Sequence, residues 1–304
     1  LHYYLFIPVN QIGNYIVLVF AFLLFISLVT SLCFYKKWYR KLFTLTTNKG
    51  PLVFFRSLHR LVGVWSAPMI LVFSITGIWY FVERANVGNV SDKIDSDIPR
   101  VERVDSAVYN SRSFTYDIDY YRATQIAKEE IPGLEIGEVV PPLGADRPLY
   151  INGKSHVPLV RSRANRVYLN PYDYTVVGIQ KAENENAISW INDIADPIHF
   201  GYWGGLITKI IWFIFGLSIS GLILTGVWIS LKRNLKKSKK VFPYWEIFNW
   251  VGYLVVMGFM HYLLTVRYTV SLPVLLAIYA VWAVLIAITY YVFVIRLRRN
   301  VSMP

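Results

Sequence analysis

The chain has a single cysteine, and its acidic residues are confined to one part of it. Cys33 excludes an internal disulfide framework, and we expect it to be a small, packed apolar side chain. Apart from Glu246, every Asp and Glu lies between Glu83 and Asp196. The sequence has no Cys-x-x-Cys-His, no Gly-x-Gly-x-x-Gly, no phosphate-binding loop and no His-Glu-x-x-His. Covalent haem attachment, nucleotide binding and zinc-protease chemistry are therefore poorly supported.

Apolar residues, by contrast, are abundant and occur in long runs. They make up 55% of the 304 residues, which is above the usual share for a soluble domain and indicates a membrane protein. Five stretches are long and apolar enough to cross a bilayer of about 30 Å. They cover roughly residues 13–35, 61–82, 204–231, 247–266 and 272–295. The sequence therefore predicts an α-helical membrane protein with about five transmembrane helices.

The basic residues gather in short segments between these stretches. Loops rich in Lys and Arg mark the cytoplasmic side of a membrane protein, so we place these segments inside and residues 84–198 outside. The net charge of +12 therefore reflects membrane topology and not nucleic-acid binding. The basic residues are Lys36, Lys37, Arg40, Lys41, Lys49, Arg56 and Arg60 in the first loop, Lys232, Arg233, Lys236, Lys237, Lys239 and Lys240 in the second, and Arg296, Arg298 and Arg299 at the end.

The outer segment has the pattern of a small α+β domain. Tyr120–Glu130 has helical spacing, and Ile131-Pro132-Gly133 stops it. Strand-like runs separated by Pro, Gly and Asn turns predict an antiparallel sheet under this helix. The runs are Leu134–Val140, Leu149–Ile151, Val157–Val160, Arg166–Leu169 and Thr175–Ile179. In chain order we expect two spans with a basic loop, this inserted domain, a third span with a basic loop, and two last spans, over residues 1–83, 84–198, 199–240 and 241–304.

An internal repeat links two of the histidines. His199, which stands beside several glycines, precedes an apolar run to Thr225, and His2 precedes a similar run to Thr30. The ends of the two runs align without a gap, and basic residues follow both. Two equivalent helices, each with a histidine at the same end, suggest a pair of axial ligands.

Histidine pairs of this kind suit a b-type haem. Imidazole is a common haem ligand, and two of them give a six-coordinate iron suited to electron transfer. Ionisable residues in or beside a span are also functional candidates by default. We therefore predict that His2 and His199 hold an outer haem, with His261, expected at the same level, as the alternative to His2.

His59 is the candidate for a second haem, near the cytoplasmic side. Gly63 follows one turn later on the same face of the predicted helix, and Arg60 could pair with a propionate. No second histidine of this chain falls on that side. Either an upstream helix that repeats the helix around His59 is missing from this chain, or the inner site is empty. Residues 1–41 look like the second half of a preceding copy, which favours the missing helix.

Several of these motifs together resemble those of PepSY-associated transmembrane proteins. The resemblance covers roughly residues 1–235, and the last two spans lie outside it. The helix before Ile131-Pro132-Gly133 is similar to the helix of a PepSY domain. The other matching segments are Ser57–Trp65, Ile75-Thr76-Gly77, Ile198-His199-Phe200-Gly201, Leu224-Thr225-Gly226 and the strand Val167–Asp173, in which Asn170 replaces the usual Asp.

The resemblance implies a multi-pass protein of the bacterial inner membrane with a PepSY-like domain in the periplasm. Some members are di-haem ferric-siderophore reductases, which implies His2 and His199 on the outer haem and His59 with an absent upstream histidine on the inner one. A ferric siderophore or other iron chelate would be the acceptor, and a cytoplasmic-side or quinol donor would supply electrons. The protein would contact membrane lipid and no nucleic acid.

Two rival functions remain open at this point. The first is a haem-free membrane protein whose PepSY domain binds a peptide or a protease as a regulator. In that case the histidines would be replaceable without loss of function. The second is a permease for an iron chelate, although the absence of acidic residues within the spans disfavours a proton-coupled pump.

Overall fold

The computed structural model describes residues 11–94, 97–102, 118–144, 146–236, 245–267 and 269–295. The chain divides into two compact units. The first comprises Leu1–Leu42 and Gly63–Ile219, and the second comprises Phe43–Val62 and Ser220–Pro304. Two long helices, α2 (Pro51–Arg84) and α8 (Gly205–Lys236), contribute residues to both units. The boundaries of the four parts expected from the sequence remain predictions.

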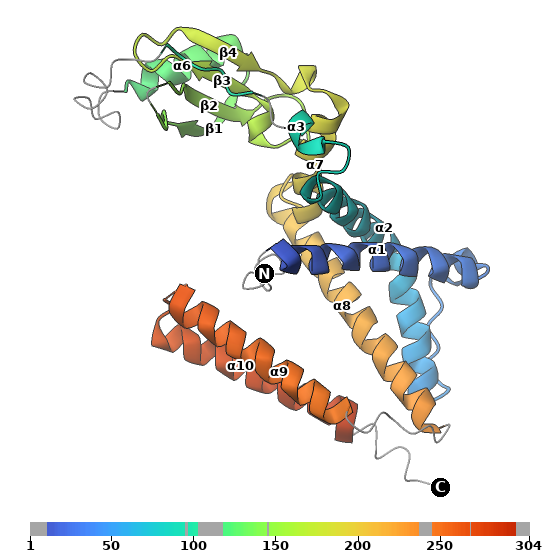
Figure 1. The fold of residues 1–304 in the computed structure, drawn as a ribbon. Coiled ribbons are helices and arrows are strands. Elements are labelled where there is room, and N and C mark those ends of the chain that lie inside the picture. Colours follow the sequence, from blue (N-terminus) through green and yellow to red (C-terminus); the bar gives the residue numbers. More distant parts are fainter. Residues whose placement is uncertain are drawn as a thin grey trace. The chain divides into compact units, whose positions relative to one another are not determined.

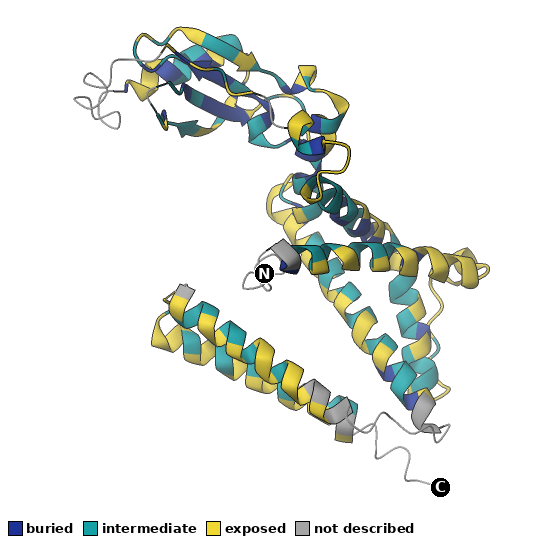
Figure 2. Cartoon of the chain, viewed as in Figure 1, coloured by how far each residue is buried: buried dark blue, intermediate teal, exposed yellow. Residues whose placement is uncertain are grey.

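The first unit contains a four-stranded antiparallel sheet in the order β1-β2-β3-β4, which with α6 we call the sheet domain (Figure 1). Its strands are β1 (Glu135–Val140), β2 (Leu149–Lys154), β3 (Arg166–Leu169) and β4 (Val176–Gln180). Leu149 pairs with Leu169 and Ile151 with Val167, and all four side chains are fully buried. Burial is accordingly concentrated on β2 and β3 (Figure 2).

Helix α6 (Tyr120–Glu130) covers this core and has the predicted bounds. Its first turn is capped by Asp119, whose side chain accepts a hydrogen bond from the backbone N–H of Arg122 at 2.9 Å. Ala123 and Ala127, one turn apart, are fully buried against the strands. The predicted packing of one helix on an antiparallel sheet is therefore confirmed for the described residues.

One predicted strand is wrong. Val157–Val160 forms a turn and not a strand, because Leu159 has a left-handed backbone with φ of 64°. Val157 and Val160 pack instead with Ala164 and Ala182, which lie in two short 3₁₀ turns. The turns are η3 (Ser162–Ala164) and η4 (Ala182–Asn184).

Helices α1 (Gln11–Phe34) and α2 pack closely in the first unit. A side chain added at Gly77 would place its Cβ 2.6 Å from the Cβ of Ala21, so glycine is what permits this close approach of the two helices. Phe22 meets Phe81 edge to face at 5.1 Å. Cys33 was expected to be packed but is exposed on α1, because little of this apolar helix is covered by protein.

Two further helices follow α2 in the first unit, and the sequence patterns did not predict either. They are α3 (Val90–Ile94) and α7 (Ala187–Phe200). Helix α7 begins at Asn186, whose side chain accepts hydrogen bonds from the backbone N–H groups of Ile188 and Ser189. It ends at Gly201, which has φ of 66° and so takes the left-handed conformation that stops many helices. The third predicted span corresponds to α8, and His199 lies before it at the end of the separate helix α7.

The second unit contains the beginning of α2, the end of α8 and the helices α9 (Trp245–Tyr262) and α10 (Leu272–Tyr290). Helices α9 and α10 are each followed by one π-helical turn, Leu263–Arg267 and Tyr291–Ile295. Arg56 and Arg60, which the sequence analysis grouped with the basic loop, lie within α2, and α2 also contains the predicted helix around His59 and Gly63. The loop between α1 and α2 keeps one 3₁₀ turn, η2 (Trp38–Lys41).

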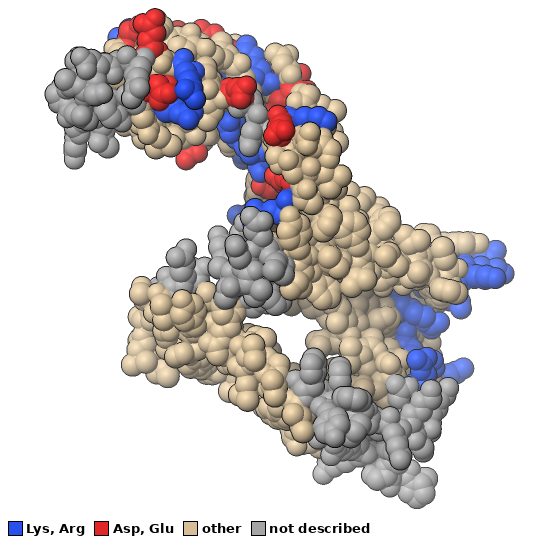
Figure 3. Space-filling view, viewed as in Figure 1, with Lys and Arg blue, Asp and Glu red and all other residues tan. Residues whose placement is uncertain are grey.

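Among the described residues, four helices are long and apolar enough to cross a membrane, within Gly13–Phe34, Pro51–Arg84, Gly205–Arg233 and Leu272–Phe293. The fifth predicted span corresponds to a shorter apolar helix at Trp250–Val266. Acidic side chains gather over the sheet domain and α7, whereas basic side chains stand without acidic ones beyond the end of α1 (Figure 3). Length, composition and charge therefore support a multi-pass membrane protein with an inserted sheet domain.

Candidate functional site

His59 lies in the third turn of α2 and faces α8. Its Nδ1 atom is 2.9 Å from the hydroxyl oxygen of Thr225, and its Nε2 atom has no hydrogen bond with the described residues. Gly226 brings the α8 backbone close to the ring, because a Cβ at this position would lie 3.4 Å from Cε1 of His59. An alanine here would just touch the imidazole, and a longer side chain would reach over it.

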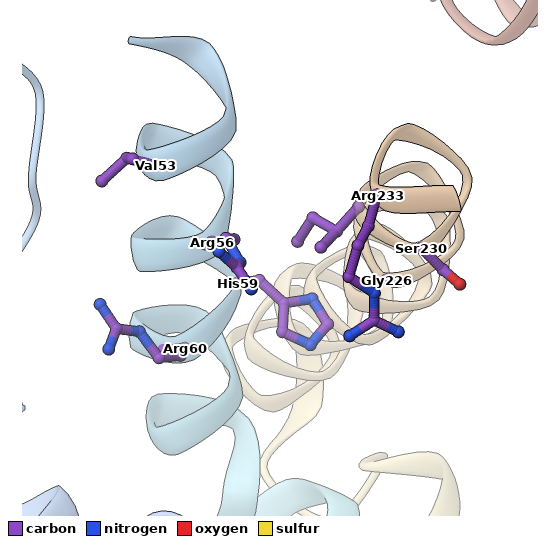
Figure 4. Close-up of a pocket in the computed structure, with 8 residues that line it drawn as sticks. Val53, Arg56, His59, Arg60, Gly226, Ser230 and Arg233 are labelled. Carbon is purple, nitrogen blue, oxygen red and sulfur yellow. The ribbon is translucent and has the colours of Figure 1, made fainter. Parts of the chain in front are cut away.

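A pocket of about 550 Å³ opens beside this histidine. This volume is within the range of small-molecule and cofactor sites, about 300–1,000 Å³. In Figure 4 the imidazole of His59 and the guanidinium of Arg233 extend toward each other from α2 and α8, while Arg60 leaves α2 on a different side from His59. The lining residues are Val53, Arg56, His59, Arg60, Gly226, Ile229, Ser230 and Arg233, and none of them is acidic.

The chemistry of the lining residues fits a flat, anionic group with a metal at its centre. Three guanidinium groups, of Arg56, Arg60 and Arg233, can pair with carboxylates in a forked geometry. The imidazole of His59 offers one ligand nitrogen, and Gly226 leaves room beside it. These are the features that a b-type haem with two propionates requires on one side. Among the described residues no group of three His, Cys, Asp or Glu side chains could hold a bare metal ion.

His199 occupies the last turn of α7 and is held by α2. Its Nδ1 atom is 2.7 Å from the hydroxyl oxygen of Thr76. Phe73, Tyr80 and Phe200 surround its ring edge to face, with centroids 5.5, 5.3 and 5.0 Å away. The half-buried imidazole therefore sits in an aromatic environment, which is also typical of the walls of a haem site.

An ion-pair network fastens α7 above this histidine. Arg161 donates from Nε to Asp193 at 2.9 Å and from Nη1 to Asp196 at 2.8 Å, and Arg163 donates to the same Asp193 oxygen at 2.7 Å. The hydroxyl of Tyr80 donates to the other oxygen of Asp196 at 2.7 Å. The sheet domain, α2 and α7 thus converge on two carboxylates within one helical turn or two of His199.

The charged groups of this network shift the pKa values of their neighbours. Burial by itself would lower the pKa of Arg161, but the carboxylates of Asp196 and Asp193 outweigh burial and raise it. Glu185 shows the opposite sign: burial, and then the negative charge of Asp193, raise its pKa to about 7. A salt-bridged guanidinium and a carboxyl whose pKa is about 7 therefore both border Asp193.

The other sequence-predicted site residues have separate positions. His2 lies outside the described residues, so its pairing with His199 remains a prediction. His261 is exposed on α9, and its Nδ1 atom bonds the hydroxyl of Tyr279 on α10; its role as the alternative ligand remains a prediction as well. Gly63 lies four residues after His59 in α2, on the face expected.

Several residues of the site were not identified from the sequence. Thr76 and Thr225 are 123 and 166 residues from the histidines that they bond, and Arg161 is 35 residues from Asp196. The only available signal was that both threonines fall in the recurring motifs, Ile75-Thr76-Gly77 and Leu224-Thr225-Gly226. A threonine at the end of a repeated helix could have been weighed as a partner of the repeated histidine.

Comparison with known proteins places the chain in a family. No curated protein shows significant similarity to it. Residues 1–233, however, match the family described as the PepSY-associated TM region. This match spans all the residues that form the two histidine sites, and it ends where the second basic segment begins. Because the match covers more than half of the sequence, the chain belongs to the PepSY-associated transmembrane family.

Proposed function

We propose that this protein is a b-type cytochrome that carries electrons across the inner membrane to an acceptor in the periplasm. The observation that supports it best is His59 in a pocket of about 550 Å³ lined by three arginines. A histidine in a membrane span costs free energy, so it is a functional candidate by default. Here His59 lies beside a pocket, three arginines and Gly226.

The residues of this chain have distinct parts in the proposal. Haem, when bound, would supply a site that gains and loses one electron. His59 would ligate an inner haem through Nε2, while Arg56, Arg60 and Arg233 would pair with the propionates and set the potential through their charge. His199 would ligate an outer haem with His2 or His261, and its aromatic neighbours would limit the access of water.

The sheet domain would serve the acceptor, a ferric siderophore or another iron chelate. It is fixed to α7 through Arg161 and the two aspartates, so a chelate bound there would lie near the helix that carries His199. The electron donor would be a quinol or a cytoplasmic-side reductant.

Haem content per chain tests the proposal. The wild-type protein, purified from haem-replete cells, should contain one to two haems by the pyridine haemochrome method. His59→Ala and His199→Ala should each lower this content, whereas His156→Ala should not, because His156 is an exposed residue paired with Glu183. Colourless wild-type protein would favour the haem-free peptide- or protease-binding regulator, and transport of intact chelate without reduction would favour the permease.

A further inference from the structure

Each of the two described site histidines bonds a threonine that is already bonded to its own helix. Thr225 lies 2.9 Å from Nδ1 of His59 and 2.7 Å from the carbonyl oxygen of Gly221. Thr76 lies 2.7 Å from Nδ1 of His199 and 2.7 Å from the carbonyl oxygen of Val72. The arrangement is crossed, because α2 supplies a histidine to one pair and the threonine to the other.

The number of protons in each pair determines which atom donates. A threonine hydroxyl has one proton to donate and two lone pairs to accept. A carbonyl oxygen can only accept, so an oxygen–oxygen distance of 2.7 Å requires the hydroxyl proton of Thr225 to point at Gly221. The same holds for Thr76 and Val72. The hydroxyl oxygen then has only lone pairs to offer the imidazole, and the histidine must donate from Nδ1.

We infer that Thr225 and Thr76 are positioning residues that fix His59 and His199 in the tautomer with the proton on Nδ1. The lone pair of each ring is then on Nε2, which is the nitrogen that would ligate a metal. The partner of the non-ligating nitrogen sets the tautomer and the orientation of a ligand histidine. The inference rests on the proposed function for its purpose, but the tautomer itself is a property of the protein without haem.

The two pairs also fix the direction of each ring. For His59, Gly226 lies against Cε1 at contact distance while Thr225 holds Nδ1, so the ring is restrained at two neighbouring atoms. Loss of the threonine hydroxyl would leave both the orientation and the protonation of the ring free to change. Loss of the hydrogen-bond partner of a ligand histidine typically lowers metal affinity by about 10–100-fold.

The test uses Thr225→Val, which keeps the shape of the side chain and removes the hydroxyl, and Thr225→Ser, which keeps the hydroxyl. Thr289→Val is the matched control, because the Thr289 hydroxyl donates a bond of the same 2.7 Å length to the carbonyl oxygen of Leu285, four residues earlier, and bonds no histidine among the described residues. Imidazole ¹⁵N shifts of the haem-free protein report the tautomer, with His59→Gln to assign the signal. Haem titration reports affinity.

We expect a protonated Nδ1 in the wild type, in Thr225→Ser and in Thr289→Val, a mixture of tautomers in Thr225→Val, and a fall of about 10–100-fold in haem affinity only in Thr225→Val. A proton on Nε2 in the wild type would overturn the inference. So would a Thr225→Val protein with wild-type shifts and affinity. If the tautomer is as expected but the wild type binds no haem, the tautomer assignment stands and the proposed function fails.

Discussion

Arg161 connects the sheet domain to α7, and its replacement by Met should destabilise that connection strongly. Met keeps much of the length and the apolar contact of the side chain but has no donors. The change removes bonds to Asp193 at 2.9 Å, to Asp196 at 2.8 Å and to the carbonyl oxygen of Asn192 at 3.0 Å. Asp193 is only 3% exposed, so its charge cannot recover full hydration.

The expected cost is about 3 kcal/mol. Removing one partner of a buried ion pair costs about 3–5 kcal/mol. The lower end applies here because the Arg161 side chain is 20% exposed and Arg163 still pairs with Asp193. Arg163→Met is the matched control. It removes a single bond to a carboxylate that keeps Arg161, so it should cost about 1 kcal/mol.

Thermal unfolding of the full chain, followed by near-ultraviolet circular dichroism, measures both variants. For a domain of about 100 residues, a loss of about 1 kcal/mol lowers Tm by roughly 4 °C. The Tm of Arg161→Met should therefore fall by roughly 12 °C and that of Arg163→Met by roughly 4 °C. The Arg161 variant should also lose outer haem, because Asp196 lies one turn before His199. Equal shifts for the two variants would refute the view that Arg161 is the main tie.

Two further predictions concern Glu185 and Gly226. Because the pKa of Glu185 is raised from 4.5 to about 7, the folded state keeps a proton that the unfolded state loses in this range, so stability should fall by about 1 kcal/mol as pH rises from 4.5 to 7. Glu185→Gln should remove that pH dependence. If the free energy of unfolding of Glu185→Gln changes with pH as steeply as that of the wild type, the assignment is contradicted. Gly226→Leu should displace His59 and abolish the inner haem, whereas Gly221→Leu, at a position with open space on the same helix, should not; equal haem content in both variants would contradict the contact.

Local sequence patterns were sufficient where one segment determines its own structure. Helix α6 has an Asp cap, alanines one turn apart and a Pro-Gly stop, and it was predicted to the residue. The four strands were located by their alternation and turns. Hydropathy also located the spans, and the predicted helix around His59 and Gly63 is part of α2, which extends before the apolar run 61–82 to include Arg56 and Arg60 because arginine is a good helix former.

Patterns failed where the deciding partner is distant in the sequence. Helix α7 carries Asn192, Asp193 and Asp196, which give it a polar appearance typical of a loop. These side chains are stabilised by Arg161, Tyr80 and Trp79 from two other segments, and no local signal indicates that. The bonds between His59 and Thr225 and between His199 and Thr76 depend in the same way on tertiary packing.

Electron transfer across a sealed membrane tests the central claim most directly. The protein is reconstituted into vesicles with a reductant trapped inside and an impermeant ferric chelate outside, and external Fe(II) is measured with a chromogenic chelator. We predict that Fe(II) appears at a rate proportional to haem-loaded protein and is lost in His59→Ala and His199→Ala but kept in His156→Ala. Haem-loaded wild-type protein that produces no external Fe(II), or histidine variants that produce it at the wild-type rate, would contradict the account.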